Sequence, residues 1–467
     1  MALDNTELSI VLKEINDTQV ADTVNRAAVL KQIIPTSSGD INARGVNLYA
    51  KVTSNPAMKW FGEGGTYPVG GNAGRVKMTA QFRRLAISSQ LTRDVLEGAD
   101  KEAIINVISE EVTDDTISAT QELSQQLYGD GSGVKAIVDS VSTLAVTFQT
   151  AYDILAANGS TAQENPYAMQ YGNYLLRKGG RYNFISGDAT SDRDAGGGTN
   201  TVAVGTVLTI AATSNVATLG SLTGANVGNF NAVPDATFIL VDGDMIVNEG
   251  SYGISVTGLN YHIDSGTGTY QNVSRNTYPT LRCYTLDSLN GALTVANLYK
   301  IIFQAKFLRN QDIMDENYVI LSSPTQVYQY ALLANLSISG GSGGTYSGLT
   351  AMPDAKKLDY GFTMFEFAGL KWVEDPHCPP HQLFIILPSK FQLREFKPLS
   401  AVPLGGDSGF APVPAFTSAG VGSYTDNAVY TMTWKGQLVT NDPAKAGVKI
   451  TNLATAGTAF LGNSFAM

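Results

Sequence analysis

The hydrophobic positions between residues 100 and 128 recur mostly four apart, the spacing of one face of an α-helix. Asp100 is placed to cap its start, and Gly129 is placed to end it in a left-handed conformation. At ~1.5 Å per residue, a helix of this length spans roughly 43 Å. Neither glycine nor proline interrupts it. The apolar stripe consists of Ile104, Ile108, Val112, Ala119, Leu123 and Leu127. The pattern predicts a rod that is packed on one side only.

Alternation of apolar and other residues within 46–91 predicts two β-strands joined as a long hairpin. The alternating positions are Val46, Leu48, Ala50 and Val52 in the first strand, and Val76, Met78, Ala80 and Phe82 in the second. The segment between them holds Gly62, Gly64, Gly65, Pro68, Gly70, Gly71 and Gly74. Such a glycine-rich tip cannot form a core of its own. We expect it to project and to become ordered only against a partner.

The rest of the chain divides into an N-terminal arm, a β-rich section and a mixed α/β section. In the arm, weak helices are expected within 7–15 and within 21–34, where Pro35 stops the second. Further strands are predicted at 201–210, 216–219, 237–241, 245–247, 318–321, 365–373 and 383–387. Helices are predicted at 292–308 and at 324–335, the latter with proline at its start. Residues 429–434 and 447–450 are predicted to form a last strand pair.

Composition limits the functions that are possible. The 467 residues are 43% hydrophobic and 15% charged, with 47 glycines, and the net charge is −10. An acidic balance argues against a generally basic nucleic-acid-binding surface. Two cysteines give no disulfide framework and indicate a reducing compartment. We find no signal-peptide pattern and no apolar run long enough for a transmembrane helix, so no membrane is expected as a partner.

The candidate chemistry is sparse. The run Gly129-Asp130-Gly131-Ser132-Gly133 superficially resembles a phosphate-binding loop, but it follows a helix and lacks the Lys-Thr/Ser ending, so we favour helix termination. His377, Cys378 and His381 are a weak candidate for zinc, set against an ordinary surface turn, because no fourth ligand is apparent. An isopeptide bond between Lys59 and Asn72 of different chains is considered unlikely. No catalytic motif is present, and neither an enzyme nor a cofactor is expected.

The order of these parts resembles the major capsid protein of tailed double-stranded DNA bacteriophages, the Hong Kong 97 capsid fold. The resemblance covers nearly the whole chain. It rests on an arm, a glycine-rich hairpin, "SSQLTRDVLEGAD" before the rod, "LYGDGSG" after it, "YQNVSRNTYPTLRC" at residues 270–283 and "VTNDPAKAGVKITNL" at residues 439–453. Each motif alone is weak. Their order and spacing carry the resemblance.

The resemblance implies an α+β fold with five parts. They are an N-terminal arm (1–45), an extended loop (46–91), a peripheral domain with a spine helix (92–292), an axial domain (293–425) and closing strands that return to the peripheral domain (426–467). The β-rich section departs from the family pattern, and residues 196–250 are expected to form an insertion or an enlarged sheet. Gly340, Gly341, Gly343 and Gly344 are expected in a mobile loop near a capsomer axis.

The implied function is self-assembly into hexamers and pentamers of an icosahedral virion capsid around double-stranded DNA, without sequence-specific binding, in the host cytoplasm. Because the arm lacks a long charged leader, we expect a separate scaffolding protein, together with a portal. A decoration protein is a further candidate partner. An encapsulin-like compartment shell is the alternative; a secreted β-rich adhesin fits the sequence less well. Inter-subunit contacts are expected between two charged sets. They are Lys59, Arg75, Lys77, Arg83 and Arg84 of the hairpin, and Glu110, Glu111, Asp114 and Asp115 of a neighbour's rod.

Overall fold

The protein is described here by a computed structural model. The structure describes residues 28–37, 45–92, 101–142, 145–149, 154–155, 163–164, 176, 180–185, 204–210, 216–223, 242–309, 311–314, 316–336, 356–357, 363–401, 410–417 and 420–454. The chain forms two compact units. The first combines Met1–Ala50, Val76–Leu127 and Phe391–Asn441, and the second combines Lys51–Arg75, Tyr128–Lys390 and Asp442–Met467. Helices and several sheets together give the α+β fold that the sequence predicts.

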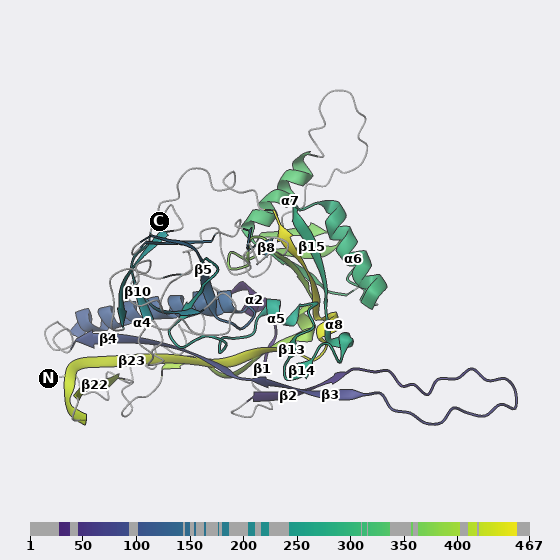
Figure 1. The fold of residues 1–467 in the computed structure, drawn as a ribbon, viewed down its shortest axis with the longest axis horizontal. Coiled ribbons are helices and arrows are strands. Elements are labelled where there is room, and N and C mark those ends of the chain that lie inside the picture. The colour runs from purple at the N-terminus through teal and green to yellow at the C-terminus, as the bar shows by residue number, and fades with distance from the viewer. Residues whose placement is uncertain are drawn as a thin grey trace, which may run out of the picture. The chain divides into compact units, whose positions relative to one another are not determined.

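The first unit contains the predicted rod. Helix α4 spans Lys101–Gln126, within two residues of both predicted ends. It lies beside strand β4, Arg83–Thr92 (Figure 1). Strand β4 pairs with the long strand β23, which also pairs with β21 and β22. This unit also contains α2 (Val29–Ile33), β1 (Thr36–Ser37), β21 (Phe391–Ala401), β22 (Phe410–Thr417), β23 (Gly420–Thr440) and most of the hairpin strands described below.

The buried face of α4 is only partly apolar. Val112, Ala119 and Leu123 are buried as predicted, and so are Thr116 and Thr120. The Thr116 hydroxyl donates to the Val112 carbonyl oxygen at 2.7 Å, and the Thr120 hydroxyl donates to the Thr116 carbonyl oxygen at 2.7 Å. Because these hydroxyls are satisfied within the helix, small polar residues pack at positions that a hydrophobic pattern does not mark.

The predicted hairpin forms from strands β2 and β3. Strand β2 spans Gly45–Lys51 and strand β3 spans Arg75–Gln81, and the two pair only with each other among the described elements. Strand β2 alternates between buried and exposed side chains, as a strand with one packed face does. In β3, Met78 and Ala80 are buried. The loop between the strands is counted with the second unit.

The β-rich section of the second unit forms a closed barrel. Its strands run in the order β10-β11-β6-β5-β12-β9, and closure leaves this sheet without an edge. The strands are β5 (Val134–Ser142), β6 (Ala145–Phe148), β9 (Arg181–Ile185), β10 (Val204–Ile210), β11 (Val216–Thr223) and β12 (Met245–Asn248). Part of the expected insertion at 196–250 therefore belongs to the barrel. The predicted strand at 237–241 lies outside the described residues, as does most of the N-terminal arm.

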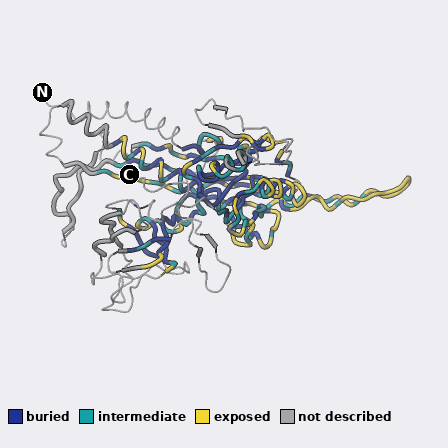
Figure 2. The backbone as a smooth tube through the Cα atoms, turned by 90° about the horizontal axis from the view of Figure 1, so that it is seen from above, coloured by how far each residue is buried: buried dark blue, intermediate teal, exposed yellow. Residues whose placement is uncertain are grey.

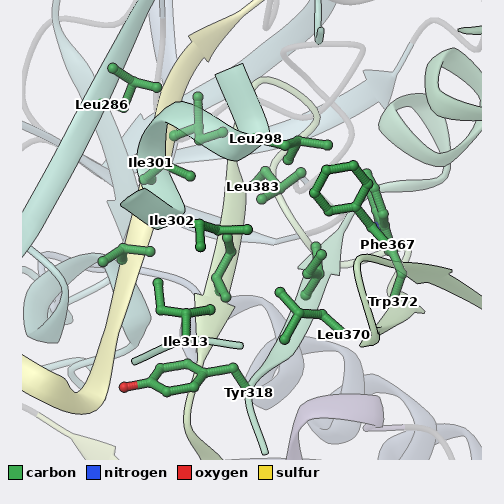
Figure 3. Packing of buried hydrophobic residues seen from close by; sticks show 14 of the residues in the cluster. Leu286, Leu298, Ile301, Ile302, Ile313, Tyr318, Phe367, Leu370, Trp372 and Leu383 are labelled. Atoms are coloured by element: carbon green, nitrogen blue, oxygen red, sulfur yellow. The ribbon is translucent and has the colours of Figure 1, made fainter. Parts of the chain in front are cut away.

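The second unit also contains a seven-stranded mixed sheet, in the order β15-β24-β20-β16-β19-β18-β17. Its strands are β15 (Tyr284–Gly291), β16 (Val319–Ser322), β17 (Lys356–Lys357), β18 (Thr363–Phe367), β19 (Leu370–Glu374), β20 (Leu383–Ile386) and β24 (Gly447–Leu453). Helices α6 (Val295–Arg309) and α7 (Pro324–Leu336) confirm the two predicted helices. Both helices contribute to one apolar core with Trp372 and Leu383 (Figure 3).

Two strand predictions are wrong. The stretch 365–373 is not one strand, because Ala368 and Gly369 take positive φ angles of 51° and 82° and turn the chain between β18 and β19. Residues 429–434 and 447–450 do not pair with each other. The former lie in β23, and the latter lie in β24 between β15 and β20. The Asp442-Pro443 segment and helix α8, Pro443–Ala446, separate them.

The segment between the barrel and the mixed sheet is held by one buried arginine. The Arg275 guanidinium carbon lies 4.5 Å from the Tyr270 ring centroid, and Nη1 lies 2.9 Å from Oδ2 of Asp264. Its Nη2 donates to the carbonyl oxygen of Tyr261 at 2.8 Å. The segment contains α5 (Leu259–His262), β13 (Thr269–Tyr270), β14 (Val273–Ser274) and the 3-10 turn Pro279–Leu281. Two further short strands, Ile154–Leu155 and Gln163–Glu164, pair with each other.

No helix in the described part of the chain is long and apolar enough to cross a membrane.

Candidate assembly interface

The hairpin loop, defined as residues 52–74, is closed at its base by backbone and side-chain hydrogen bonds. The Val52 N–H donates to the Gly74 carbonyl oxygen at 2.9 Å, and the Gly74 N–H donates to Oγ1 of Thr53 at 2.8 Å. A Cβ at residue 74 would lie 2.4 Å from the same Thr53 oxygen. A side chain at residue 74 would therefore displace the Thr53 hydroxyl that closes the base of the loop.

The tip of the hairpin loop is a turn that carries two aromatic rings. The Gly65 N–H donates to the Gly62 carbonyl oxygen at 2.9 Å, and Gly64 has a φ angle of +78°. Across this turn the rings of Phe61 and Tyr67 meet edge to face, with centroids 5.0 Å apart. This geometry is a favoured one for aromatic pairs, and it gives the tip a defined shape.

Large apolar side chains of the hairpin loop are exposed. Figure 2 shows this segment mostly in the exposed colour. Trp60 is fully accessible at 101%, and Met58, Tyr67 and Val69 are 82%, 82% and 90% exposed. Scattered apolar residues on a surface are ordinary, but several on one short loop indicate a binding site. The sequence-based prediction considered the glycine residues of the loop and did not identify its exposed aromatic residues.

The basic residues predicted for inter-subunit contacts follow the hairpin strands. Arg75, Lys77 and Arg84 are exposed, and Arg83 is half-buried. In β3 the buried Met78 and Ala80 occupy one face, so Arg75 and Lys77 share the other. Lys59 lies in the loop, where its Nζ donates to Oγ1 of Thr66 at 3.4 Å.

The predicted acidic residues lie on α4. Asp114 is exposed, whereas Asp115 is half-buried and accepts a 2.5 Å hydrogen bond from the Ser89 hydroxyl of β4 in the same chain. Glu110 and Glu111 lie in the helix one turn before Asp114 and Asp115, and their side chains lie outside the described part. Asp114 is therefore the better candidate for contact with a neighbour, since Asp115 already has a partner.

The weak metal candidate does not form a metal-ligating group. Among the described residues, no three His, Cys, Asp or Glu side chains are placed to share an ion. His377 faces Asp375, with Nδ1 3.3 Å from Oδ1, and that carboxylate also accepts from the Tyr128 hydroxyl at 2.7 Å. Cys378 is buried, and burial raises the pKa of its thiol well above the ordinary value, with Asp375 adding to the shift.

His381 is buried as a neutral imidazole. Burial, and to a smaller extent the nearby charge of Lys449, lower its pKa to about 3. Neither ring nitrogen has a hydrogen-bond partner among the described residues. An imidazole of this kind carries no charge at neutral pH and belongs to the packing of the mixed sheet.

The run that resembles a phosphate loop is a turn after α4, as favoured from the sequence. Gly131 and Gly133 have φ angles of +90° and +81°. The carboxylate of Asp130 accepts hydrogen bonds from both the backbone N–H and the hydroxyl of Ser132. Its groups are thus used to close the turn. The glycine loop at Gly340, Gly341, Gly343 and Gly344 lies outside the described residues.

Sequence reasoning missed a second exposed apolar surface, on helix α6. The helical spacing predicted one apolar face made of Leu298, Ile301, Ile302, Ala305 and Leu308. The first four are buried, whereas Leu308 is exposed. The spacing did not register that Tyr299, Phe303 and Phe307 make the outer face apolar as well. The available signal was a helix that is hydrophobic all round, which indicates burial on both sides.

The chain is similar to solved capsid structures over nearly its whole length, whereas no family model and no curated protein matches it. The Cyanophage A-1(L) capsid asymmetric unit is 12% identical, with 93% of each chain covered and a TM-score of 0.47. The capsid of a native GTA particle is 9% identical, with 92% of this chain and 91% of that chain covered and a TM-score of 0.42. A structure from Mycobacterium phage Bobi is 9% identical, with 97% and 99% covered and a TM-score of 0.40.

Proposed function

We propose that this chain is the major capsid protein of a tailed double-stranded DNA bacteriophage, a structural protein and not an enzyme. Copies assemble into hexamers and pentamers of an icosahedral shell. The observation that carries this proposal is the hairpin loop, which exposes Met58, Trp60, Tyr67 and Val69. Several large apolar side chains exposed on one loop mark a contact with another molecule, and a second copy of the chain would supply that surface.

The charge distribution supports contacts between copies. Residues 46–90 carry six basic residues and one acid, or +5, whereas residues 100–130 carry one lysine and eight acids, or −7. Isolated exposed ion pairs contribute only ~0–1 kcal/mol each. Repeated over a closed shell, several such pairs select the direction and register of docking between the hairpin of one copy and α4 of the next.

The acidic balance of the chain supports a non-adhesive container. At a net charge of −10, the protein repels the phosphate backbone overall, which suits DNA that is packed and later released without sequence-specific binding. We further propose assembly in the host cytoplasm with a separate scaffolding protein and a portal, and with a decoration protein as a further candidate partner.

The alternative is an encapsulin-like compartment, which encloses a protein cargo. Particles purified from infected cells and treated with DNase separate the two functions. Protected double-stranded DNA of uniform length is the outcome expected for a capsid. A protein cargo without protected DNA would contradict the proposal and favour the compartment.

A further inference from the structure

Helix α6 has two apolar faces. Leu298, Ile301 and Ile302 point into the core of the mixed sheet (Figure 3). Val295, Tyr299, Phe303 and Phe307 recur every four residues on the opposite side, here called the α6 face. Phe303 is 56% exposed and Phe307 is 87% exposed. Exposing these large apolar side chains to water is unfavourable. Such a surface therefore marks a contact with another molecule.

The α6 face is held in place by a series of aromatic contacts that reaches the core. The rings of Tyr299 and Phe303 stack with centroids 6.0 Å apart, and Tyr299 lies 5.0 Å from Phe367. Phe367 is buried and contacts Tyr330, which stacks on Trp372 at 4.6 Å. Because these contacts hold Tyr299 and Phe303 in place, a partner that binds here does not have to order those two rings.

Two lysines flank the α6 face. Lys300 and Lys306 are both exposed, and the Nζ of Lys306 lies 2.7 Å from Oδ2 of Asp312. Lys300 has no ion-pair partner within the described part of the chain. A complementary partner would therefore present aromatic or aliphatic side chains beside one carboxylate.

The tip of the hairpin loop has this composition. Phe61 and Tyr67 form its ring pair, Trp60 lies next to Phe61, and Glu63 lies in the turn between them. Glu63 is exposed and has no ion-pair partner among the described residues. It is also the only acid between residues 46 and 90.

We propose that the tip of the hairpin loop of one copy docks on the α6 face of a second copy, with Glu63 opposite Lys300. The inference rests on the proposed function, because it requires copies to assemble. Aromatic side chains at the centre with a charged pair at the rim are the usual arrangement of a strong contact. The proposal assigns the tip to α6, while the basic strands of the hairpin remain available for the acids of α4.

Engineered cysteines test this pairing in assembled particles. Both native cysteines, Cys283 and Cys378, are buried, so disulfides between chains report only the introduced thiols. The variant E63C/K300C should give a ladder of disulfide-linked oligomers on a non-reducing gel after mild oxidation of particles. The variants E63C and K300C alone should not. The matched control is E63C/E249C, since Glu249 is also exposed and lies in the second unit.

The outcomes separate the possible occupants. A ladder from E63C/K300C alone supports the proposal. Particles without that ladder, or an equal ladder from E63C/E249C, overturn it while leaving the capsid function intact. Dimers from K300C alone would show that α6 faces a second α6, which also overturns it. If wild-type protein never forms particles, the proposed function itself fails.

A charge exchange gives a second test if the double cysteine variant does not assemble. Glu63→Lys and Lys300→Glu should each slow assembly, and E63K/K300E should recover most of the wild-type rate, with the subunit folded in every case. Both side chains are exposed, so neither change disturbs the core. Failure of the double exchange to recover more than either single variant would overturn the pairing.

Discussion

The rings of Phe61 and Tyr67 lie 5.0 Å apart across the tip of the hairpin loop, on a segment whose other large side chains are exposed. A geometric contact of this kind preserves the shape of the tip before any partner binds. Binding then costs less conformational entropy than it would for a disordered loop.

Removing this ring pair should impair assembly but not folding. We expect Tyr67→Ala to leave the free energy of unfolding of the isolated subunit within about 0.5 kcal/mol, because Tyr67 is exposed. The yield of sedimenting particles should fall markedly. Tyr67→Phe is the matched control, since it keeps the ring and should assemble like the wild type. Equal particle yields from the alanine and phenylalanine variants would contradict this account.

Reversing the charge of two acids on the rod should block assembly. Reversing the charge of two basic residues of the hairpin in the same chain should partly restore it. We expect E110K/D114K to remain folded by circular dichroism and to yield few particles, because the basic hairpin strands would then face lysines. Adding R75E/K77E in the same chain should partly restore the yield. Light scattering at low and moderate salt measures the effect. Normal assembly of E110K/D114K under both conditions would mean that the charges are only solvated.

Stability of the subunit should fall with decreasing pH partly through His381. Its folded-state pKa is about 3, below the ordinary value of 6.5, so the unfolded chain binds more protons between these limits. The contribution of His381 to the free energy of unfolding is therefore complete above pH 6.5. It is lost as the pH falls toward 3, at up to about 1.4 kcal/mol per pH unit.

Replacement of His381 by leucine isolates that contribution. Urea unfolding of wild type and H381L between pH 7 and pH 4.5 should give a flatter dependence for the variant, because leucine does not titrate and fills a similar volume. Carboxylates contribute equally to both proteins, so the difference between the two slopes is the measurement. Identical slopes would contradict this, because they would mean that His381 has the same pKa in the folded and the unfolded protein.

Gly447 should be intolerant of a side chain. A Cβ there would lie 2.8 Å from the Ile385 carbonyl oxygen in the adjacent strand and 2.7 Å from Cδ1 of Ile263. Gly447→Ala should therefore destabilise the subunit by roughly 1–3 kcal/mol in denaturant unfolding. Gly268→Ala is the control, because no atom lies within 4 Å of its added Cβ, and it should be neutral. Equal midpoints for the two variants would contradict the packing described for β24.

The sequence predicts the long helices and the two hairpin strands, because their periodicity is strong, but it does not predict the long strands β4, β21 and β22. Helix α4, the two hairpin strands and helices α6 and α7 lie within three residues of their predicted limits. Strand pairing was less predictable. Nothing local shows that β23 and β24 belong to different sheets, since that depends on contacts far apart in the chain. The turn at Ala368 was missed because alanine seldom takes a positive φ angle.

The candidate interface was predictable in its charges but not in its apolar part. A count of lysines and acids finds the opposite signs of the hairpin and the rod. The exposure of Trp60 and Phe303 depends on which face of each element is covered, and that is a tertiary property. The hydroxyl of Thr116 likewise looks polar in the sequence, yet it bonds within its own helix and is buried.

Cryo-electron microscopy of the purified protein tests the central claim most directly, because it reports both the assembly and the position of the hairpin. We predict closed icosahedral particles in which residues 52–74 of each subunit lie on an adjacent subunit, with Trp60 and Tyr67 covered. Monodisperse monomers over a wide range of concentration and salt, or shells in which the hairpin loop extends freely into solvent, would contradict the account.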